Sequence, residues 1–401
     1  MSMDVSKVER CDEGEIAAQV FHLCLRAPWD PAVLEAAREV AAQGDVAWQA
    51  LFEIAYASGL APLFYAIVRG QGLLPSEVED ELRLVYFASA KRNVRLFHEL
   101  EGVLRHLAVA GVPVVLLKGA ALAEPVYANQ AVRPVGDFDL LVRRDGLSAT
   151  LDALAALGYV FSHAETHPGD SVTYENEIAL FKPGGSGCVL EIHWSLFDSP
   201  YYQHKMPMDW FWQSAQPFEI GQVATLMLGP EALMLHLCGH LALHHGGGDN
   251  LNLRWLYDVA AVIASYGERM DWDEVLERAQ AYDLVLSLQR VLPEMSDEWD
   301  VPMPAGVLER LRGLRPSRDE ERVFGQLTAA RRPVIQRFWA DLVNMPDWRA
   351  RVRYAWNNMF PSPLYMQRRY SIRHRFLLPL YYPYRWWLGV YEALTARQAR
   401  R

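Results

Sequence analysis

Hydrophobic residues recur at helical spacing over the first quarter of the chain. From about Asp12 to Ala110 they lie three and four positions apart, as in the segments PAVLEAAREVAAQ and VEDELRLVYFASAKRNVRLFHEL. This spacing places apolar side chains on one face of a helix. Gly111 and Pro113 end the last of these helices, because neither residue suits a helix interior. We therefore predict an N-terminal helical region over residues 1–110.

The hydrophobic period changes between residues 111 and 200. VPVVLLKG and GDFDLLVRR are short apolar runs typical of buried strands, and LSATLDALAALG between the second strand and Gly158 has the pattern of a helix. Two further β-like runs, VTYENEIALFKP and CVLEIHWSLF, flank a turn rich in proline and glycine at 183–187, which indicates a hairpin. A small mixed β-sheet core is expected over this range.

Helical periodicity returns from about Met208, in segments such as EALMLHLCGHLALHH and LRWLYDVAAVIASYG. We predict a C-terminal helical domain over residues 201–345 and a basic, aromatic tail over residues 346–401. The predicted fold class is α+β, with a small mixed sheet between helical N-terminal and C-terminal regions.

The net charge of −10 is distributed unevenly. Residues 349–401 contain eleven arginines and one acid, Glu392, so this segment carries +10 and the remainder −20. An overall negative charge argues against a general nucleic-acid coat protein. The tail interleaves arginine with tyrosine and tryptophan, which fits peripheral contact with an anionic membrane or stacking on a nucleic acid. Prolines at 361, 363, 379 and 383 interrupt a long amphipathic helix and favour a third interpretation, packing against the acidic body.

The cysteine pattern and the lengths of the hydrophobic runs indicate in which cellular compartment the protein is expected. The four cysteines form no CxxC pair, and Cys238 in an apolar helical pattern is expected to be a buried free thiol. The charged N-terminus lacks the apolar region of a signal peptide, and no run approaches the roughly 18 apolar residues of a spanning helix. We expect a reduced, cytoplasmic protein without a transmembrane segment.

Acidic residues at strand spacing are the main candidate chemistry. Asp137 and Asp139 lie two apart in a predicted strand, so they share one face while Phe138 turns into the core. Glu191 alternates in the same way in the hairpin and can join them if the two strands pair. Adjacent carboxylates repel unless a cation lies between them, and oxygen ligands select Mg²⁺ or Mn²⁺. Two such ions would activate an attacking hydroxyl and hold a triphosphate.

Basic and glycine residues near these acids fit phosphate binding. Gly119 directly follows a buried strand, where backbone N–H groups can approach a phosphate, and Lys118 adds a positive charge. An ordinary strand-to-helix turn is the alternative. Arg133, four residues before Asp137, either holds a phosphate or pairs with Asp137 or a surface acid.

Histidines provide further candidates. His193 shares the face of Glu191, where it either touches an acceptor or is a structural histidine. His236, His240 and His244 recur every fourth residue on one helix, which is compatible with a transition-metal site. We favour instead a helix packed over the active cleft, with His240 or His244 meeting the nucleotide or acceptor. Asp258 is expected to pair with this helix.

The segments LLKGAAL, RPVGDFDLLV and LEIHW together resemble the uncharacterised nucleotidyltransferase family of the DNA polymerase β-like superfamily. The similarity extends from about residue 50 to 380. It implies that residues 111–200 form the nucleotidyltransferase core, with Asp137 and Asp139 as the metal-binding pair, Glu191 as the third acid and Gly119 in the phosphate loop. Ala120 departs from the Gly-Ser or Gly-Gly loop common in the superfamily and lacks a hydroxyl for phosphate.

The resemblance implies a reaction type. A nucleoside monophosphate would pass from an NTP, with ATP the first candidate, to an unidentified acceptor with release of pyrophosphate. Asp137, Asp139 and Glu191 would hold two Mg²⁺ or Mn²⁺ ions, and Glu191 would act as general base. Lys118, Gly119, Ala120 and Arg133 would surround the nucleotide. Two alternatives are a kinase-like phosphotransferase on the same fold and a catalytically inactive nucleotide-binding module.

Overall fold

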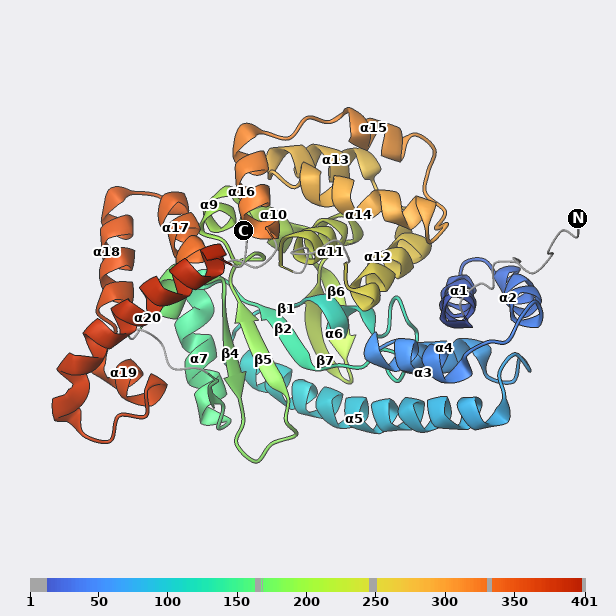
Figure 1. The fold of residues 1–401 in the computed structure, drawn as a ribbon, viewed down its shortest axis with the longest axis horizontal. Coiled ribbons are helices and arrows are strands. Elements are labelled where there is room, and N and C mark those ends of the chain that lie inside the picture. Colours follow the sequence, from blue (N-terminus) through green and yellow to red (C-terminus); the bar gives the residue numbers. More distant parts are fainter. Residues whose placement is uncertain (1–12, 163–166, 168, 245–250, 330–333, 399–401) are drawn as a thin grey trace, which may run out of the picture.

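A seven-stranded mixed sheet lies in the middle of the protein, between helical regions at both ends of the chain (Figure 1). The computed structural model describes residues 13–162, 167, 169–244, 251–329 and 334–398. The sheet order is β3-β4-β5-β2-β1-β7-β6. The strands are β1 (Val115–Leu116), β2 (Asp137–Leu141), β3 (Val160–Phe161), β4 (Glu177–Phe181), β5 (Val189–His193), β6 (Gln216–Ile220) and β7 (Val223–Met227). The α+β fold class is confirmed.

Helices precede the sheet and follow its strands. The N-terminal helices are α1 (Glu13–Arg26), α2 (Val33–Ala42), α3 (Trp48–Ala57), α4 (Ala61–Val68) and the long α5 (Ser76–Val109). Within the central part of the chain are α6 (Lys118–Leu122), the 3₁₀ turn η1 (Arg144–Gly146), α7 (Leu147–Ala156) and α8 (Asp170–Tyr174). The first helices after β5 are α9 (Pro200–Lys205) and α10 (Met208–Gln213).

The remaining helices form two groups. The first comprises α11 (Pro230–His244), α12 (Leu253–Tyr266), α13 (Trp272–Ala281), α14 (Val285–Asp297), α15 (Val307–Gly313) and α16 (Arg318–Thr328). The second lies beside α7 at one end of the protein (Figure 1) and comprises α17 (Val334–Asn344), α18 (Trp348–Met359), α19 (Pro363–Arg369), the 3₁₀ turn η2 (Arg375–Leu377) and α20 (Leu378–Gln398). No helix of the described residues is long and apolar enough to cross a membrane.

Strand alternation divides the core into two layers. Phe138, Leu140 and Leu190 are completely buried and pack in a cluster with α5 and α7. Val115 and Leu141, which point the other way, join a second cluster with α11, α12 and α14. Because side chains alternate along a strand, the acidic positions of β2 and β5 belong to the second face. The site therefore lies between the sheet and the C-terminal helices.

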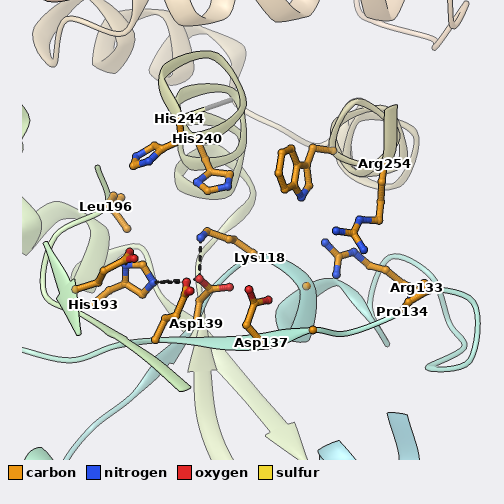
Figure 2. A pocket seen from close by; sticks show the side chains of 15 residues that line it. Lys118, Arg133, Pro134, Asp137, Asp139, His193, Leu196, His240, His244 and Arg254 are labelled. Carbon is orange, nitrogen blue, oxygen red and sulfur yellow. Dashed lines mark hydrogen bonds and ion pairs between the residues drawn. The ribbon is translucent and has the colours of Figure 1, made fainter. Parts of the chain in front are cut away.

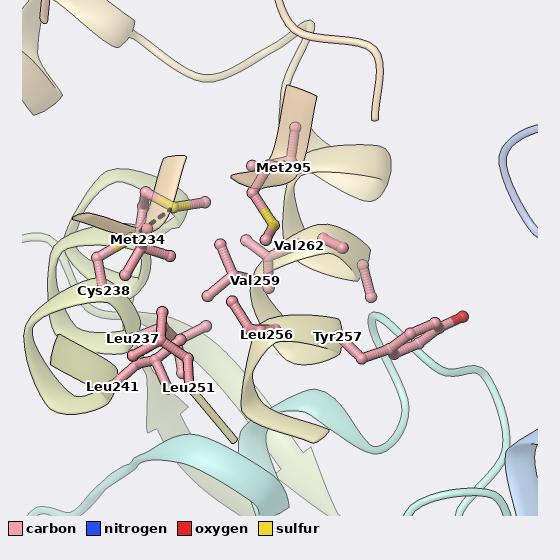
Figure 3. Packing of buried hydrophobic residues seen from close by; sticks show 14 of the residues in the cluster. Met234, Leu237, Cys238, Leu241, Leu251, Leu256, Tyr257, Val259, Val262 and Met295 are labelled. Carbon is pink, nitrogen blue, oxygen red and sulfur yellow. Dashed lines mark hydrogen bonds between the residues drawn. The ribbon is translucent and has the colours of Figure 1, made fainter. Parts of the chain in front are cut away.

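Helices α11 and α12 are fixed relative to each other by buried side chains. Figure 3 shows Leu237, Cys238 and Leu241 of α11 facing Leu256 and Val259 of α12. Each fully buried aliphatic side chain stabilises such packing by about 1.5–3 kcal/mol. The expected free, buried Cys238 is confirmed, and Cys24 and Cys188 are buried free thiols as well. This packing holds the polar residues of both helices above the sheet.

Two features correct the interpretation of the sequence. We expected helical structure from about Met208, but β6 and β7 form an antiparallel pair there, and β7 pairs in parallel with β1. A two-residue turn joins them, and Gly221 adopts a φ of 59°, which glycine tolerates best.

We also expected prolines to interrupt the last helix, but α20 contains Pro383 and runs through 21 residues. Both prolines of α20 lie in its first two turns, so most of its hydrogen-bond ladder is intact.

Candidate active site

The three predicted acids come from two neighbouring parallel strands. Asp137 and Asp139 lie on β2 and Glu191 on β5, and the register places Asp139 opposite Glu191. Phe138 is completely buried on the opposite face, as alternation predicts. All three acids line one pocket of about 320 Å³ between the sheet and helices α11 and α12 (Figure 2). The hairpin acid therefore points toward the aspartate pair.

A fourth acid, Glu177 on β4, completes the cluster. It lies opposite His193 in the antiparallel β4–β5 pair and lines the same pocket. Burial and the neighbouring charge of Glu191 raise its pKa. Glu177 was not among the residues that we predicted for the site. The alternation in Glu-Ile-Ala-Leu-Phe could have indicated it, because Ile178 and Leu180 are buried on the other face.

His193 is at the centre of the acids rather than at their edge. Its Nε2 lies 3.0 Å from Asp139 Oδ1 and 3.8 Å from Glu191 Oε2, and its Nδ1 lies 3.1 Å from Glu177 Oε2. Burial disfavours the imidazolium, but the contacts with Asp139, Glu191 and Glu177 outweigh it and raise the pKa of His193 to about 9. At neutral pH the ring is therefore protonated and donates to Asp139.

Lys118 contributes a second cation at the same carboxylate. Its ammonium donates to Asp139 Oδ1 over 2.7 Å, from a backbone position with a φ of 46°. Burial alone would lower the pKa of Lys118, but Asp139 raises it. Burial alone would likewise raise the pKa of Asp139, but Lys118 and His193 hold it well below its usual range. Lys118 thus faces the acids at the pocket floor.

Arg133 forms a buried ion pair with Asp258, a residue for which we had predicted a different partner. Its Nε and Nη2 donate to Asp258 of α12 over 2.9 and 2.7 Å, and Tyr127 donates its hydroxyl to the same carboxylate over 2.5 Å. We expected Asp258 to pair with α11 and considered Asp137 a partner of Arg133. The fork geometry explains the preference for Asp258, because Nε donates to Oδ1 while Nη2 donates to Oδ2.

Gly119 is required by the position of Arg133. A Cβ built on Gly119 would lie 2.1 Å from Arg133 Nη1, and this guanidinium is fixed by its two bonds to Asp258. The glycine therefore permits close approach of a cation to the start of α6. Ala120 is buried beside it, at 2% exposure, and packs with the sheet cluster.

Replacing Gly119 with Ala is expected to lower the free energy of unfolding by about 1–3 kcal/mol, because the added methyl group cannot be accommodated without moving Arg133. Urea denaturation followed by circular dichroism measures this. Gly102→Ala in α5 is the matched control, since nothing lies within 4 Å of its Cβ position, and it should be neutral or stabilising by up to about 1 kcal/mol. Equal stability of the two variants would show that Arg133 has room to move.

The upper wall of the pocket comes from α11 and α12. His240 and His244 of α11 and Arg254 and Trp255 of α12 line it, facing the acids (Figure 2). The rings of His240 and His244 stack at 5.1 Å, and His240 meets Trp255 edge-on at 5.6 Å. The expectation that His240 and His244 lie over the cleft matches this geometry. Arg254 and Trp255 were not identified from sequence.

The donors in the pocket fit a divalent cation. One ligand atom each from Asp139, Glu191 and His193 lies within 4.8 Å of the others, and Asp137 lines the same pocket. The carboxylate oxygens of Asp137, Asp139 and Glu191 suit Mg²⁺ or Mn²⁺, which prefer oxygen ligands. Protonated His193 would contact these carboxylates and would not itself bind the ion. This group does not include the histidines of α11, so the described residues give no support to a transition-metal site on that helix.

Acids on adjacent parallel strands of a mixed sheet thus lie beneath a wall of basic and aromatic side chains. Residues 44–293 match the family described as "Uncharacterised nucleotidyltransferase", and the chain belongs to this family. The resemblance found in the sequence is thereby confirmed over residues 44–293, and its extension to about residue 380 stays a prediction.

The structure is also similar to the crystal structure of an antigenic nucleotidyltransferase-like protein from Paracoccidioides brasiliensis. The two share 14% sequence identity with a TM-score of 0.34, over 54% of this chain and 97% of the other. No curated protein matches the chain.

Proposed function

We propose that the protein transfers a nucleoside monophosphate from an NTP to an acceptor group, with release of pyrophosphate. The observation that carries this proposal is the register of β2 and β5, which brings Asp139 and Glu191 side by side in a polar pocket. Membership of the nucleotidyltransferase family supplies the reaction class. ATP is the first nucleotide to test.

The acids of the pocket floor have separate roles in this proposal. Asp137, Asp139 and Glu191 would hold Mg²⁺ or Mn²⁺, which stabilises charge on the triphosphate and the leaving pyrophosphate. Glu191, which is only partly buried, would accept the proton of the acceptor hydroxyl. His193 would orient the Asp139 carboxylate, and Glu177 would orient the His193 ring that it contacts.

The cations of the pocket are suited to the triphosphate. Arg254 and Arg133 both line the pocket beside the single carboxylate of Asp258, and burial together with the charge of Arg133 lowers the pKa of Arg254. The Nε of Arg254 is buried and has no hydrogen-bond partner among the described residues. An anionic ligand would supply the missing charge and the missing acceptor. We assign phosphate binding to Arg254, supported by Lys118, Gly119 and the free edge of Arg133.

Arg254→Ala is expected to raise the KM for the nucleotide by roughly 10- to 100-fold and to change kcat less, because a charge-assisted hydrogen bond to phosphate contributes about 1.5–3 kcal/mol. Steady-state kinetics with varied NTP measures the two constants. Arg269→Ala is the control, since Arg269 is exposed beyond the end of the same helix and donates to Ser265. An unchanged KM in Arg254→Ala would remove this residue from the nucleotide site.

The reaction itself is tested by identifying its products. Purified protein, Mg²⁺ and each NTP, labelled at the α- or the γ-phosphate, are incubated with cell extract as the source of acceptor. Transfer of the α-label with release of pyrophosphate supports the proposal. Transfer of the γ-label with release of a nucleoside diphosphate would assign a kinase-like activity instead. Absence of both transfer and a Mg²⁺–NTP-dependent thermal shift would assign an inactive module.

A further inference from the structure

The C-terminal group of helices carries a surface that the catalytic proposal does not use. Residues 349–401 have a balance of +10, and the helices α17 to α20 form a separate layer at the end of the protein (Figure 1). They contact the rest of the chain through polar and aromatic contacts, including Asn357 with Asp170 at 2.7 Å and the rings of Tyr174 and Tyr354 at 5.1 Å. Much of their apolar surface is therefore turned to solvent.

Helix α20 has an exposed apolar stripe. Leu380, Tyr384, Trp387 and Tyr391 follow the spacing four, three, four, which places them within an arc of about 60° on one helix face. Their exposures are 69%, 47%, 60% and 52%. We call these four residues the α20 stripe.

The opposite face of α20 makes hydrogen bonds to residues 359–361. Tyr382 donates its hydroxyl to the carbonyl of Pro361 over 2.7 Å, and Trp386 donates its indole N–H to the carbonyl of Met359 over 2.8 Å. The Phe360 ring meets Trp386 edge-on at 5.4 Å. Because these residues lie on the far side of the helix, the α20 stripe points away from residues 359–361. Within the stripe, Tyr384 also meets the ring of Tyr370 at 6.0 Å, next to Arg369.

A cluster of arginines precedes the stripe. Arg368 and Arg369 end α19, and Arg373 and Arg375 follow in the connection to α20. All four are exposed, and no ion pair joins them to an acid within the described residues. Phe376, 75% exposed, adjoins them. From the sequence we favoured packing of these arginines against the acidic body of the protein. For these four residues that prediction is wrong, because they are exposed and form no such ion pairs within the described residues.

We propose that the α20 stripe and this arginine cluster form a docking surface for an anionic lipid membrane. Exposed tryptophan and tyrosine on one helix face would lie at the level of the lipid headgroups. The aliphatic side chain of Leu380 would enter the acyl boundary, and the arginines would bind lipid phosphates. The opposite charges of the tail and the lipid surface supply the attraction.

Nucleic acid is a poorer occupant of the same surface. Base stacking needs open aromatic faces, but the rings of the stripe already stack on each other, Tyr384 with Trp387 at 6.3 Å and Trp387 with Tyr391 at 5.4 Å. Leu380 offers no stacking surface. The mixture of aliphatic and aromatic side chains fits a bilayer interface better.

Sedimentation with vesicles tests the proposal on the full chain. Vesicles of phosphatidylcholine with about one-third phosphatidylglycerol are compared with pure phosphatidylcholine, at low salt and at high salt. We expect binding to the anionic vesicles to exceed binding to the neutral ones by roughly tenfold and to weaken at high salt. Equal binding to both lipids, or no binding to either, would overturn the proposal.

Variants locate the surface. Tyr384→Ser with Trp387→Ser, and separately Arg373→Glu with Arg375→Glu, are expected to lower vesicle binding by roughly tenfold or more. Leu84→Ser with Phe87→Ser removes similarly exposed apolar side chains from α5, at 68% and 59% exposure, and should bind as the unchanged protein does. The assignment would be overturned if the control pair lost vesicle binding to the same extent. It would also be overturned if the unchanged protein bound a single-stranded RNA oligonucleotide and no vesicles. Circular dichroism verifies that each variant is folded.

Discussion

Replacing Asp139 with Asn is expected to lower the rate of nucleotidyl transfer by on the order of 10³-fold. Asp139 is 3% exposed, lies opposite Glu191 and contacts both cations of the pocket floor. The amide keeps the size of the side chain but removes the charge that holds a divalent ion, and such an ion stabilises the transition state by several kcal/mol. Single-turnover transfer of an α-labelled NTP measures the loss.

The matched control for this prediction is Asp145→Asn. Asp145 lies in η1, a few residues beyond the same strand, and is exposed. The two variants have the same net charge, so a difference between them reflects the site. Isothermal titration with Mn²⁺ and the NTP together provides a second measurement, in which only Asp139→Asn should lose binding. Transfer at an unchanged rate in Asp139→Asn would reject the proposed centre.

Asp258→Asn is expected to lower the free energy of unfolding by about 3–5 kcal/mol. The change leaves the Arg133 guanidinium, 7% exposed, without a counter-charge, and an unpaired buried charge is the costliest outcome of breaking an ion pair. It also weakens the bond that Tyr127 donates to the same carboxylate. Urea denaturation of the two proteins measures the difference.

The double variant Arg133→Met with Asp258→Leu distinguishes the cost of an unpaired buried charge from the cost of lost side-chain packing. Removing both charges is expected to restore most of the stability, because no charge is then left buried alone. Asp273→Asn is the control, since its pair with Arg310 is exposed and contributes about 0–1 kcal/mol. If Asp258→Asn costs no more than Asp273→Asn, Arg133 is satisfied by other groups.

The parts of the site that the sequence predicted depend on strand alternation. Asp137 and Asp139 are two apart, and Glu191 has buried neighbours on both sides, so the shared face could be inferred before the strands were paired. The pairing of β2 with β5 was the remaining assumption, and the register confirms it. The hairpin around residues 183–187 was predictable because turn residues separate its two strands.

Other parts follow from contacts between distant segments. Arg133 and Asp258 are separated by 125 positions, and no local pattern relates them. Arg254 and Trp255 are placed by the packing of α12 on α11, and Glu177 by its strand partner β5. The strands β6 and β7 have the same length as β2, β4 and β5, but most of their side chains are not buried, so they lack the clear apolar pattern of the other strands. The sequence therefore predicted which residues share a strand face, but not which segments meet across the pocket.

The contacts of Asp139 have a consequence for how the centre is loaded. Before any metal binds, two positive charges from the protein already touch this carboxylate, the ammonium of Lys118 at 2.7 Å and the imidazolium of His193 at 3.0 Å. In the proposed centre a divalent ion alone would compete with both of these cations and would bind weakly. Lys118 could instead donate to the oxygens of a bound triphosphate, which would leave Asp139 available to an ion. Nucleotide and metal would then enter as one complex. Lys118 and His193 would lower the affinity of the acids for a metal ion without nucleotide.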